Sequence, residues 1–405
     1  MANTSHSQPF ALLHGEQLEE YRPGGFHPVH IGDTFKDGRY QVLRKLGHGA
    51  FSTVGLAEDL SSATFVAIKI GRSDSPYAVE EIRIHKHLVA VDENGDSSGS
   101  HIVKLLDNFL HTGPNGQHVC MVFEPMGPGL SSRFKEGRRS MLGIPYEEAR
   151  SVVKQLLSSL DYLHQHRIAQ RDLNFGNILI AIDLSDLAKT FQDNTFSKVE
   201  RHVYMHEDQP LIEFLDKHTA VTVKLSDLGA AFPFERPPDK PVVPVALRAP
   251  EIVLGSEYNH TIDIWSFGCL VFEIFTGSQL FGVYPLPYMT DIEVNDGHLL
   301  QMVSTLGQLP PSQFAKWTRG SRYFDSNMNL VRSDAGPDEK PYGDLYVGST
   351  LEVRFMERKP QQMDAEECGL VLSFLRRALQ YDPSSRPTTS ELLKDPWIKS
   401  IVDEL

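Results

Sequence analysis

The sequence contains little cysteine and no long apolar run. Its 405 residues include three cysteines, which show neither metal-ligand spacing nor the even number that disulfide pairing requires: Cys120, Cys269 and Cys368. No stretch of about 18 consecutive apolar residues is present, and the first twenty residues lack the basic start and the apolar run of a signal peptide. We therefore expect a protein of a reducing compartment that is neither secreted nor membrane-spanning.

Positive charge is also scarce. Asp and Glu outnumber Lys and Arg by 53 to 39, which gives a formal net charge of −14. This balance argues against binding of nucleic acid and mildly favours basic partners, although charge that only keeps the protein soluble is the simpler explanation. No cluster of about five to eight basic residues suggests a nuclear import signal, so we expect the cytoplasm and leave the nucleus open.

The apolar pattern divides the chain into a strand-rich first part and a helical second part. Residues 1–37 are polar and rich in Gly and Pro, which predicts an N-terminal extension. Alternating apolar residues predict about five strands and one main helix over residues 38–126, whereas helical spacing dominates residues 127–400, before a tail at 401–405. Residues 183–218 are charged and weakly periodic and predict an insertion with some helix. We expect an α+β fold with a small antiparallel β-rich N-lobe and a larger, mainly α-helical C-lobe.

A glycine-rich turn lies between the first two predicted strands. It reads Gly47-His48-Gly49-Ala50-Phe51-Ser52-Thr53-Val54, and its small residues let backbone N–H groups approach the oxygens of a triphosphate. The turn alone is weak support for a nucleotide site, because hairpin turns are often rich in glycine.

The third predicted strand carries Lys69, at the spacing at which a lysine points inward to the phosphates of a nucleotide. The alternative is a strand lysine exposed to solvent. Glu81, on the next helix, favours the first interpretation, because its carboxylate would pair with Lys69 and hold the ammonium group over the phosphates. Glu80 is the neighbouring alternative, and we prefer Glu81 because the stripe of Ile82 and Leu88 then faces the sheet.

A second set of polar residues follows the long helix predicted before residue 168. The run Gln170-Arg171-Asp172-Leu173-Asn174-Phe175-Gly176-Asn177 precedes a short strand, and Ser226-Asp227-Leu228-Gly229 follows another. Asp172 would accept the proton of a substrate hydroxyl, while Asn177 and Asp227 would bind magnesium. Phosphoryl transfer needs a backbone cradle, a cation, metal ligands and an aligning carboxylate, and their occurrence in this order argues against coincidence. The sequence therefore predicts ATP and Mg²⁺ as cofactors.

Three residues of the helical part are expected to support this loop structurally. Glu251, in Arg248-Ala249-Pro250-Glu251, would form a buried ion pair with Arg386. Asp263 would accept backbone hydrogen bonds from the loop around Asp172. These residues would hold the site in place without taking part in the chemistry.

With these residues placed, the chain resembles the serine/arginine-rich protein kinase family, in the group that also contains cyclin-dependent and MAP kinases. The resemblance covers roughly residues 20–400 and is carried by YRPGGFHPV, IGDTFKDGRYQVLRKLGHGAFSTV, MVFEPMG, GHLLQMVSTLGQLP and the leucine of Asp227-Leu228-Gly229. It implies a bilobal eukaryotic protein kinase domain over residues 38–400. It also implies a monomeric serine/threonine kinase whose substrates are arginine/serine-rich proteins held in an acidic docking groove.

The resemblance also assigns site residues. Phe123 would be the gatekeeper beside the nucleotide, the backbone of Glu124 and Met126 would bind adenine, and Asn174 would join Asp172 and Lys69 in catalysis. The residues expected to bind ATP are Gly47, His48, Gly49, Ala50, Phe51, Ser52, Val54, Ala67, Lys69, Glu81, Phe123, Glu124 and Met126.

The sequence departs from the family pattern at four positions. Gln170 replaces the usual histidine, Asn174 stands where most serine/threonine kinases carry a lysine, and Pro244 and Leu247 replace a threonine and a tyrosine. The lysine and the threonine normally contact each other and the catalytic aspartate, so their joint replacement puts the transfer rate and the choice of hydroxyl in doubt. The alternative reading is a nucleotide-binding pseudokinase that acts as a scaffold. A small-molecule kinase is disfavoured by the protein-substrate features of the second lobe.

Two further features concern regulation and docking. No Ser, Thr or Tyr lies between Gly229 and Glu251, so this loop cannot be activated by its own phosphorylation, and we expect constitutive activity. Asp291, Glu293 and Asp296 form an acidic cluster, but the rest of that helix lacks the acids expected of a docking groove. Strong processive docking is therefore not expected.

Overall fold

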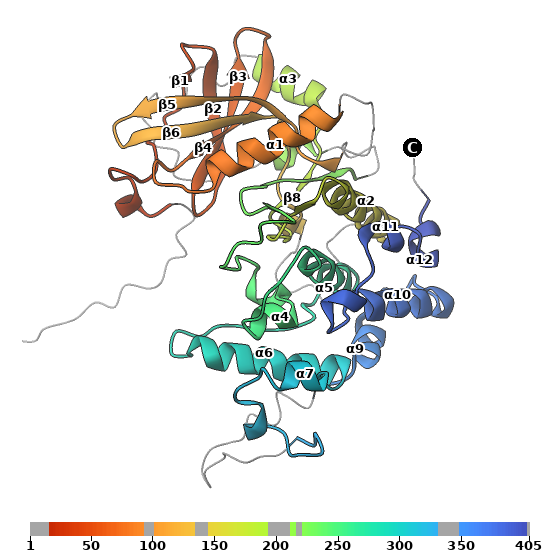
Figure 1. Cartoon of the computed structure of the whole chain (residues 1–405). Coiled ribbons are helices and arrows are strands. Elements are labelled where there is room, and N and C mark those ends of the chain that lie inside the picture. Colours follow the sequence, from red (N-terminus) through yellow and green to blue (C-terminus); the bar gives the residue numbers. More distant parts are fainter. Residues whose placement is uncertain are drawn as a thin grey trace, which may run out of the picture. The chain divides into compact units, whose positions relative to one another are not determined.

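The computed structural model describes residues 16–92, 101–133, 145–192, 211–215, 221–330 and 348–402. The chain forms two compact units (Figure 1). The first comprises Met1–Lys86, Val103–Pro128 and Ala181–Lys217, and the second comprises His87–Ile102, Gly129–Ile180 and His218–Leu405. The chain crosses from the first unit to the second between Pro128 and Gly129, in the glycine-containing segment that follows the predicted strands.

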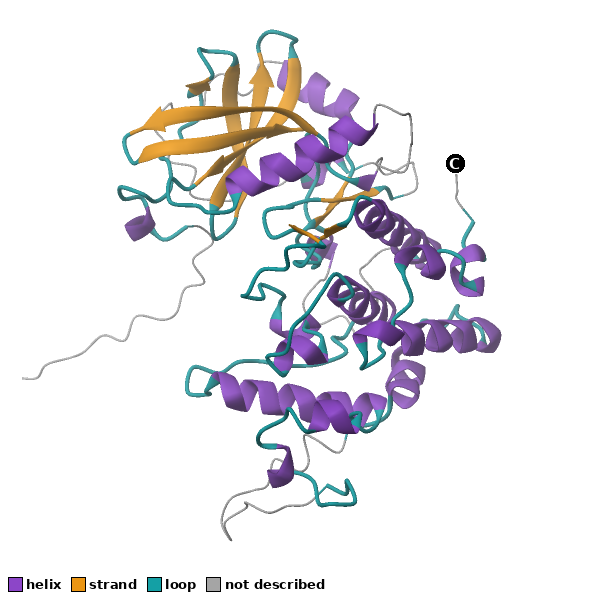
Figure 2. Ribbon diagram, viewed as in Figure 1, coloured by secondary structure: helices purple, strands orange, loops and turns teal. Residues whose placement is uncertain are grey.

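The first unit is built on a six-stranded antiparallel sheet, whose strands are orange in Figure 2. The strand order is β1-β2-β3-β4-β6-β5. The bounds are β1 Thr34–Phe35, β2 Tyr40–His48, β3 Ser52–Asp59, β4 Thr64–Gly71, β5 Leu105–Gly113 and β6 Gly116–Phe123, and the main helix is α1 Ala78–Asp92. The sequence predicted about five strands. The additional one, β1, has only two residues and lies inside the expected extension, so it is too short to show an alternating pattern.

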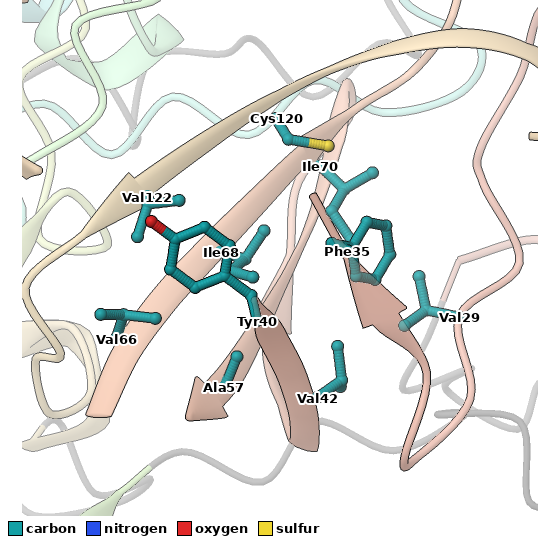
Figure 3. Packing of buried hydrophobic residues seen from close by; sticks show 10 residues of the cluster. All are labelled: Val29, Phe35, Tyr40, Val42, Ala57, Val66, Ile68, Ile70, Cys120 and Val122. Atoms are coloured by element: carbon teal, nitrogen blue, oxygen red, sulfur yellow. The ribbon is translucent and has the colours of Figure 1, made fainter. Parts of the chain in front are cut away.

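A buried apolar cluster covers one face of this sheet (Figure 3). Alternate residues of β4, Val66, Ile68 and Ile70, are at most 3% exposed and belong to this cluster. Val29, which precedes β1, packs among them, so the segment before the sheet contributes to the core of the unit. The ten residues are Val29, Phe35, Tyr40, Val42, Ala57, Val66, Ile68, Ile70, Cys120 and Val122.

The expected insertion at residues 183–218 contains two short helical elements that pack on the first unit. They are α3 Leu184–Gln192 and the 3₁₀ helix η5 Ile212–Phe214. Three side chains of this region are buried in one cluster with Leu56 of β3: Leu187, Leu211 and Phe214. The described parts of the insertion therefore belong to the first unit, and its remaining residues, 193–210 and 216–218, lie outside the described ranges.

The second unit is mainly helical. Its longer helices are α2 Tyr146–Gln165, α5 Ile262–Thr276, α6 Asp291–Leu306, α9 Leu351–Arg358 and α10 Ala365–Ala378. Its short helices are α4 Pro250–Val253, α7 Pro311–Phe314, α11 Thr389–Leu392 and α12 Pro396–Lys399, with 3₁₀ helices η3 Leu130–Arg133, η6 Val245–Leu247, η7 Gly320–Arg322 and η8 Pro383–Ser385. Every residue of α5 except Glu273 is buried, as expected for a helix that is apolar on all sides. Helices α2 and α10 pack against it.

Two small antiparallel sheets flank the polar loop of the second unit. β7 Ile168–Ala169 pairs with β10 Phe232–Pro233, and β8 Ile178–Ile180 pairs with β9 Val223–Leu225. The loop of residues 170–177 connects β7 to β8, and Asp227 follows β9. These pairings bring together two polar segments that are about fifty residues apart in the sequence.

All three cysteines lie in the described part of the chain. Cys120, Cys269 and Cys368 are buried free thiols. Within the described ranges, no helix combines the length and the apolar character needed to cross a membrane.

Candidate active site

The glycine-rich turn of residues 47–54 joins β2 to β3. The N–H of Gly49 donates to the carbonyl of Ser52 at 2.8 Å and closes the turn. Among the described residues, a Cβ atom added at Gly47 would meet no atom within 4 Å, and one at Gly49 would meet only Oγ of Ser52 at 4.0 Å. Neither glycine has a positive φ. Packing against the described residues and backbone conformation therefore do not require glycine here, and the missing side chains leave room for an external group beside the backbone.

Four of the expected nucleotide-binding side chains share one face of the sheet. Val54 of β3 lies opposite Lys69 of β4, and Ala67 of β4 lies opposite Phe123 of β6. Directly opposed residues point to the same face, as do residues two apart on one strand. Val54, Ala67, Lys69 and Phe123 therefore form one surface, and the turn lies at the end of β3 that carries Val54.

Lys69 is paired with Glu81 of α1. Its Nζ donates to both carboxylate oxygens at 2.8 Å, and the side chains are 13% and 2% exposed. The neighbouring Glu80 instead accepts from Arg83 at 2.7 Å on the exposed side of the helix. The choice of Glu81 over Glu80 as the partner of Lys69 is confirmed, and the pair fixes the ammonium group on the face that also carries Val54 and Ala67.

The segment after β6 has a fixed backbone. Glu124 donates its N–H to the carbonyl of Lys104 at 3.2 Å, and its carboxylate accepts the N–H of Lys104 at 2.9 Å. Phe123 is 9% exposed, and its ring meets that of His85 edge-on with centroids 5.3 Å apart. Met126 is buried. The expected gatekeeper Phe123 therefore ends β6 on the shared face, and Glu124 and Met126, expected to bind adenine, directly follow it.

In the second unit, Asp263 of α5 fixes the loop that carries Asp172. Its two carboxylate oxygens accept the backbone N–H groups of Gln170 and Arg171, each at 2.8 Å, and Oδ2 also lies 2.9 Å from Nε2 of His164. Asp263 is 1% exposed, and a buried carboxylate needs such partners. The expected contact between Asp263 and the loop is confirmed.

The predicted ion pair between Glu251 and Arg386 is also present. The two guanidinium nitrogens of Arg386 donate to the two carboxylate oxygens of Glu251 at 2.6 and 2.7 Å, and both side chains are buried. This bidentate pair joins α4 to the segment before α11 within the second unit.

The carboxylate of Asp172 is held on both sides by amide groups. Nδ2 of Asn174 donates to Oδ1 at 3.1 Å, and Nδ2 of Asn177 donates to Oδ2 at 3.1 Å. The oxygen of the Asn174 side chain accepts the N–H groups of Gly176 at 2.9 Å and Asn177 at 3.2 Å, so it also caps the turn. This second contribution of Asn174 was not predicted, because the sequence indicates only that a lysine is missing.

Burial raises the pKa of Asp172 to about 6. The charge of Asp227 raises it further, whereas the hydrogen bonds from Asn177 and Asn174 lower it. A carboxylate with a pKa just below neutrality is ionised at pH 7 and still accepts a proton readily, which suits a general base. The neighbouring Arg171 has a φ of 68°, in the left-handed region that non-glycine residues rarely adopt.

Asn177 and Asp227 supply oxygen donors next to Asp172. The N–H of Ser226 donates to the carbonyl of Asn177 at 2.8 Å, which places Asp227 beside the loop. Asp227 has a φ of 55°, a conformation that costs about 1–3 kcal/mol and is often found at functional sites. Within the described residues, no group of three or more His, Cys, Asp or Glu forms a metal cage. A carboxylate and an amide oxygen nevertheless fit magnesium, which keeps several waters and binds phosphate oxygens.

Two of the departures from the family pattern have visible consequences. Gln170 is fully buried, and its Nε2 donates to the backbone carbonyl of Asp227 at 3.5 Å, the upper limit for a hydrogen bond. Its Oε1 accepts no hydrogen bond from the described part of the chain. Pro244 precedes η6, and its carbonyl accepts the N–H of Leu247 at 2.9 Å. A hydroxyl contact from position 244 to the loop of Asp172 cannot form, because proline has no hydroxyl group.

Sequence comparison identifies the class to which this fold and these residues belong. The profile of the protein kinase domain matches residues 40–398. The chain therefore belongs to the protein kinase family.

Individual relatives narrow the class. The chain is 32% identical to the serine/threonine-protein kinase SRPK of Physarum polycephalum over 95% of this chain and 92% of that protein. It is 29% identical to the protein kinase dsk1 of Schizosaccharomyces pombe over 96% and 86% of the two chains. It is 40% identical to the serine/threonine-protein kinase SKY1 of Saccharomyces cerevisiae over 48% of this chain and 27% of that protein. The enzyme is thus a serine/threonine protein kinase of the SRPK type.

Proposed function

We propose that the enzyme transfers the γ-phosphoryl group of Mg-ATP to serine hydroxyl groups of basic, arginine/serine-rich proteins. The observation that carries this proposal is the carboxylate of Asp172, which is buried, bracketed by two amides and accompanied by the oxygen donors of Asn177 and Asp227. A pseudokinase has no use for an aligned base, and the chain has a candidate residue for each part that phosphoryl transfer requires except a cation in the loop.

Each residue would have a separate role in the transfer of the phosphoryl group. Lys69, held by Glu81, binds phosphate oxygens, and the open backbone of residues 47–54 surrounds them. Asp172 orients the hydroxyl and takes its proton while the hydroxyl oxygen bonds to the γ-phosphorus. The bond between this phosphorus and the bridging oxygen breaks, and ADP leaves. Asn177 and Asp227 would hold Mg²⁺, which neutralises charge on the phosphates.

Charge supports basic substrates, but the acids of α6 are largely committed to the fold. Asp296 is 4% exposed and accepts from Nε1 of Trp317 at 2.6 Å and from the hydroxyl of Tyr323 at 3.0 Å. Glu293 forms a capping box with Thr290 at the start of α6. The net charge of −14 favours encounter with basic substrates, and the use of Asp296 and Glu293 within the fold favours separate binding events over processive phosphorylation of one bound substrate.

The test is transfer of labelled phosphate from Mg-ATP to an arginine/serine repeat peptide, with an acidic serine peptide and a tyrosine peptide for comparison. We expect transfer only to the basic serine peptide, and a loss of at least about 100-fold for Asp172→Asn. Asp186→Asn, an exposed aspartate of α3 paired with Lys189, is the matched control and keeps the full rate. Nucleotide binding without transfer that depends on Asp172 would refute the proposal and leave a scaffold.

A further inference from the structure

The lead-in, defined as residues 16–31, is attached to the first unit along its length. The N–H of Gly24 donates to the carbonyl of Asn115, in the turn between β5 and β6, at 2.8 Å. Val29 lies in the apolar cluster of Figure 3. These contacts hold the lead-in against the sheet well before β1 begins, so its first described residues lie in defined positions.

Glu16 of the lead-in forms a buried ion pair with Lys45 of β2. The two side chains are 2% and 1% exposed, and Nζ of Lys45 donates to Oε2 of Glu16. The other carboxylate oxygen, Oε1, accepts the hydroxyl hydrogen of Thr53 at 2.6 Å. Burial of two charges is costly unless both are paired and hydrogen-bonded, so the arrangement tolerates little displacement of any partner.

The partners of Glu16 lie at the base of the glycine-rich turn, one on each strand. Lys45 comes two residues before Gly47, and Thr53 is opposite His48 in the strand register. The register of β2 against β3 shifts between Lys45 and Gly47, and such an irregularity interrupts the backbone ladder. Glu16 therefore joins the two strands through side chains at the point where their backbone pairing is interrupted.

A second acidic residue of the lead-in, Glu20, contacts the turn indirectly through Arg72. Glu20 is paired with Nη1 of Arg72 at 2.8 Å, and the N–H of Arg72 donates to the carbonyl of Phe51 at 2.8 Å. A hollow of about 420 Å³ separates the lead-in from Gly49 and Ala50. The lead-in thus holds the base of the turn and one side of it, while Gly49 and Ala50 line the hollow.

We infer that Glu16 is a positioning residue for nucleotide binding, because it ties Lys45 to Thr53 and holds the base of the glycine-rich turn in the form that receives phosphates. The inference rests on the proposed use of ATP. Loss of this tie lets the turn adopt more conformations, so binding of a nucleotide must order it again and affinity falls. The residues that align the hydroxyl, Asp172 and Asn177, keep their own hydrogen bonds.

The experiment is a double-mutant cycle on the ion pair. Glu16→Leu and Lys45→Met each break the buried ion pair by removing one partner, whereas the double variant replaces both members with apolar side chains. We expect each single variant to raise the KM for ATP and the dissociation constant of ADP about tenfold, with kcat and the peptide KM changed less than about twofold. The double variant should recover most of the affinity. Glu16→Gln, which removes only the charge, serves as a milder single variant if Glu16→Leu fails to fold.

Two controls separate positioning from general stability and from the proposed function. Glu19→Gln changes an exposed neighbour of Glu16 and should leave all constants unaltered. All proteins are assayed below their melting temperatures. Variants that melt earlier but keep the wild-type KM for ATP and the wild-type ADP affinity would show that the pair is only structural and would overturn the inference. A wild-type enzyme that binds no adenine nucleotide would instead overturn the proposed function.

Discussion

Nδ2 of Asn174 lies 3.1 Å from Oδ1 of Asp172, and the oxygen of the same amide caps the turn that leads to Asn177. One neutral side chain therefore fixes both the orientation of the carboxylate and the course of the loop. A lysine at this position would bring a positive charge toward the transferred phosphate. Asn174 preserves the geometry of the loop and gives up that charge.

We predict that Asn174→Ala lowers kcat about 10- to 100-fold and leaves the KM for ATP nearly unchanged, because Asp172 loses one of its two orienting donors. Asn174→Asp should be more damaging, because it keeps the oxygen that caps the turn but places a second carboxylate beside Asp172. Steady-state kinetics with the basic serine peptide measures both effects. Full activity of Asn174→Ala would mean that Asn177 alone orients the carboxylate.

The buried pair of Glu251 and Arg386 should contribute strongly to stability. Glu251→Ala leaves the guanidinium group of Arg386 buried, with both of its 2.6–2.7 Å contacts to carboxylate lost, and should cost about 3–5 kcal/mol. The matched control is Glu352→Ala, which breaks a pair with Arg376 whose side chains are 43% and 37% exposed and should cost less than about 1 kcal/mol. Unfolding in urea measures both, and equal losses would contradict the assignment.

Much of the candidate site could be predicted from the sequence because its parts are short runs with fixed spacing. The choice of Glu81 over Glu80 is correct, but its basis holds only in part: Leu88 is buried on the same helix as Glu81, whereas Ile82 is half-buried and the buried face runs through Ile84 instead. The contact of Asp263 with the loop of Asp172 likewise follows from where each motif stands in the chain. In each case the residue type and its spacing from a neighbouring motif indicate which partner the side chain contacts.

Other features could not be predicted, because they depend on contacts between distant segments. Glu16 is one of several acids in a polar stretch, and its partner Lys45 is 29 residues away, so no local pattern marks it. The helix α3 looked like part of a charged insertion, yet Leu187 is buried with Leu56 of β3. The pairing of Glu16 and the burial of Leu187 are both decided by packing between distant segments, which a weakly periodic sequence does not reveal.

A group of three histidines predicts that stability falls as the pH falls. The ring of His27 lies 4.7 Å from that of His111 and 4.9 Å from that of His118, and burial together with these neighbours lowers the pKa of His27 to about 4. Asp33 and His30 also face it, the first raising and the second lowering its pKa. Between about pH 6.5 and pH 4 the unfolded chain binds a proton that the folded chain does not, so stability is present at neutral pH and declines as the pH falls through this window.

The contribution of His27 should be about 1–2 kcal/mol between pH 7 and pH 5. Because burial also lowers the pKa values of His260 and His298 in the second unit, the quantity to compare is the change in melting temperature from pH 7 to pH 5 in wild type and in His27→Gln. We expect a smaller change in the variant, whatever its absolute stability. An identical pH dependence in the two proteins would show that His27 does not control this loss.

The segment between Gly229 and Glu251 is ordered without a phosphate group. The guanidinium groups of Arg171 and Arg248 donate to backbone carbonyls within it, to Lys240 at 3.4 Å and to Val243 at 3.0 Å. The hydroxyl of Ser266 on α5 donates to the carbonyl of Leu247 at 3.0 Å, and the N–H of Phe234 donates to the carbonyl of Arg167 at 2.8 Å. Carbonyl groups of the chain thus occupy donors that a phosphorylated residue would otherwise engage.

Because the segment lacks Ser, Thr and Tyr and already holds these contacts, treatment with a phosphatase should leave the transfer rate within about twofold of the untreated enzyme. Enzyme made in a host without related kinases should be equally active. Ser266→Ala tests the contacts themselves: it removes one donor to the segment and should lower kcat more than it changes the KM for ATP, since it acts on the second unit only. A phosphosite elsewhere whose removal changes the rate by orders of magnitude would disprove constitutive activity, and the contacts of Arg171 and Arg248 would then describe a basal state that phosphorylation improves.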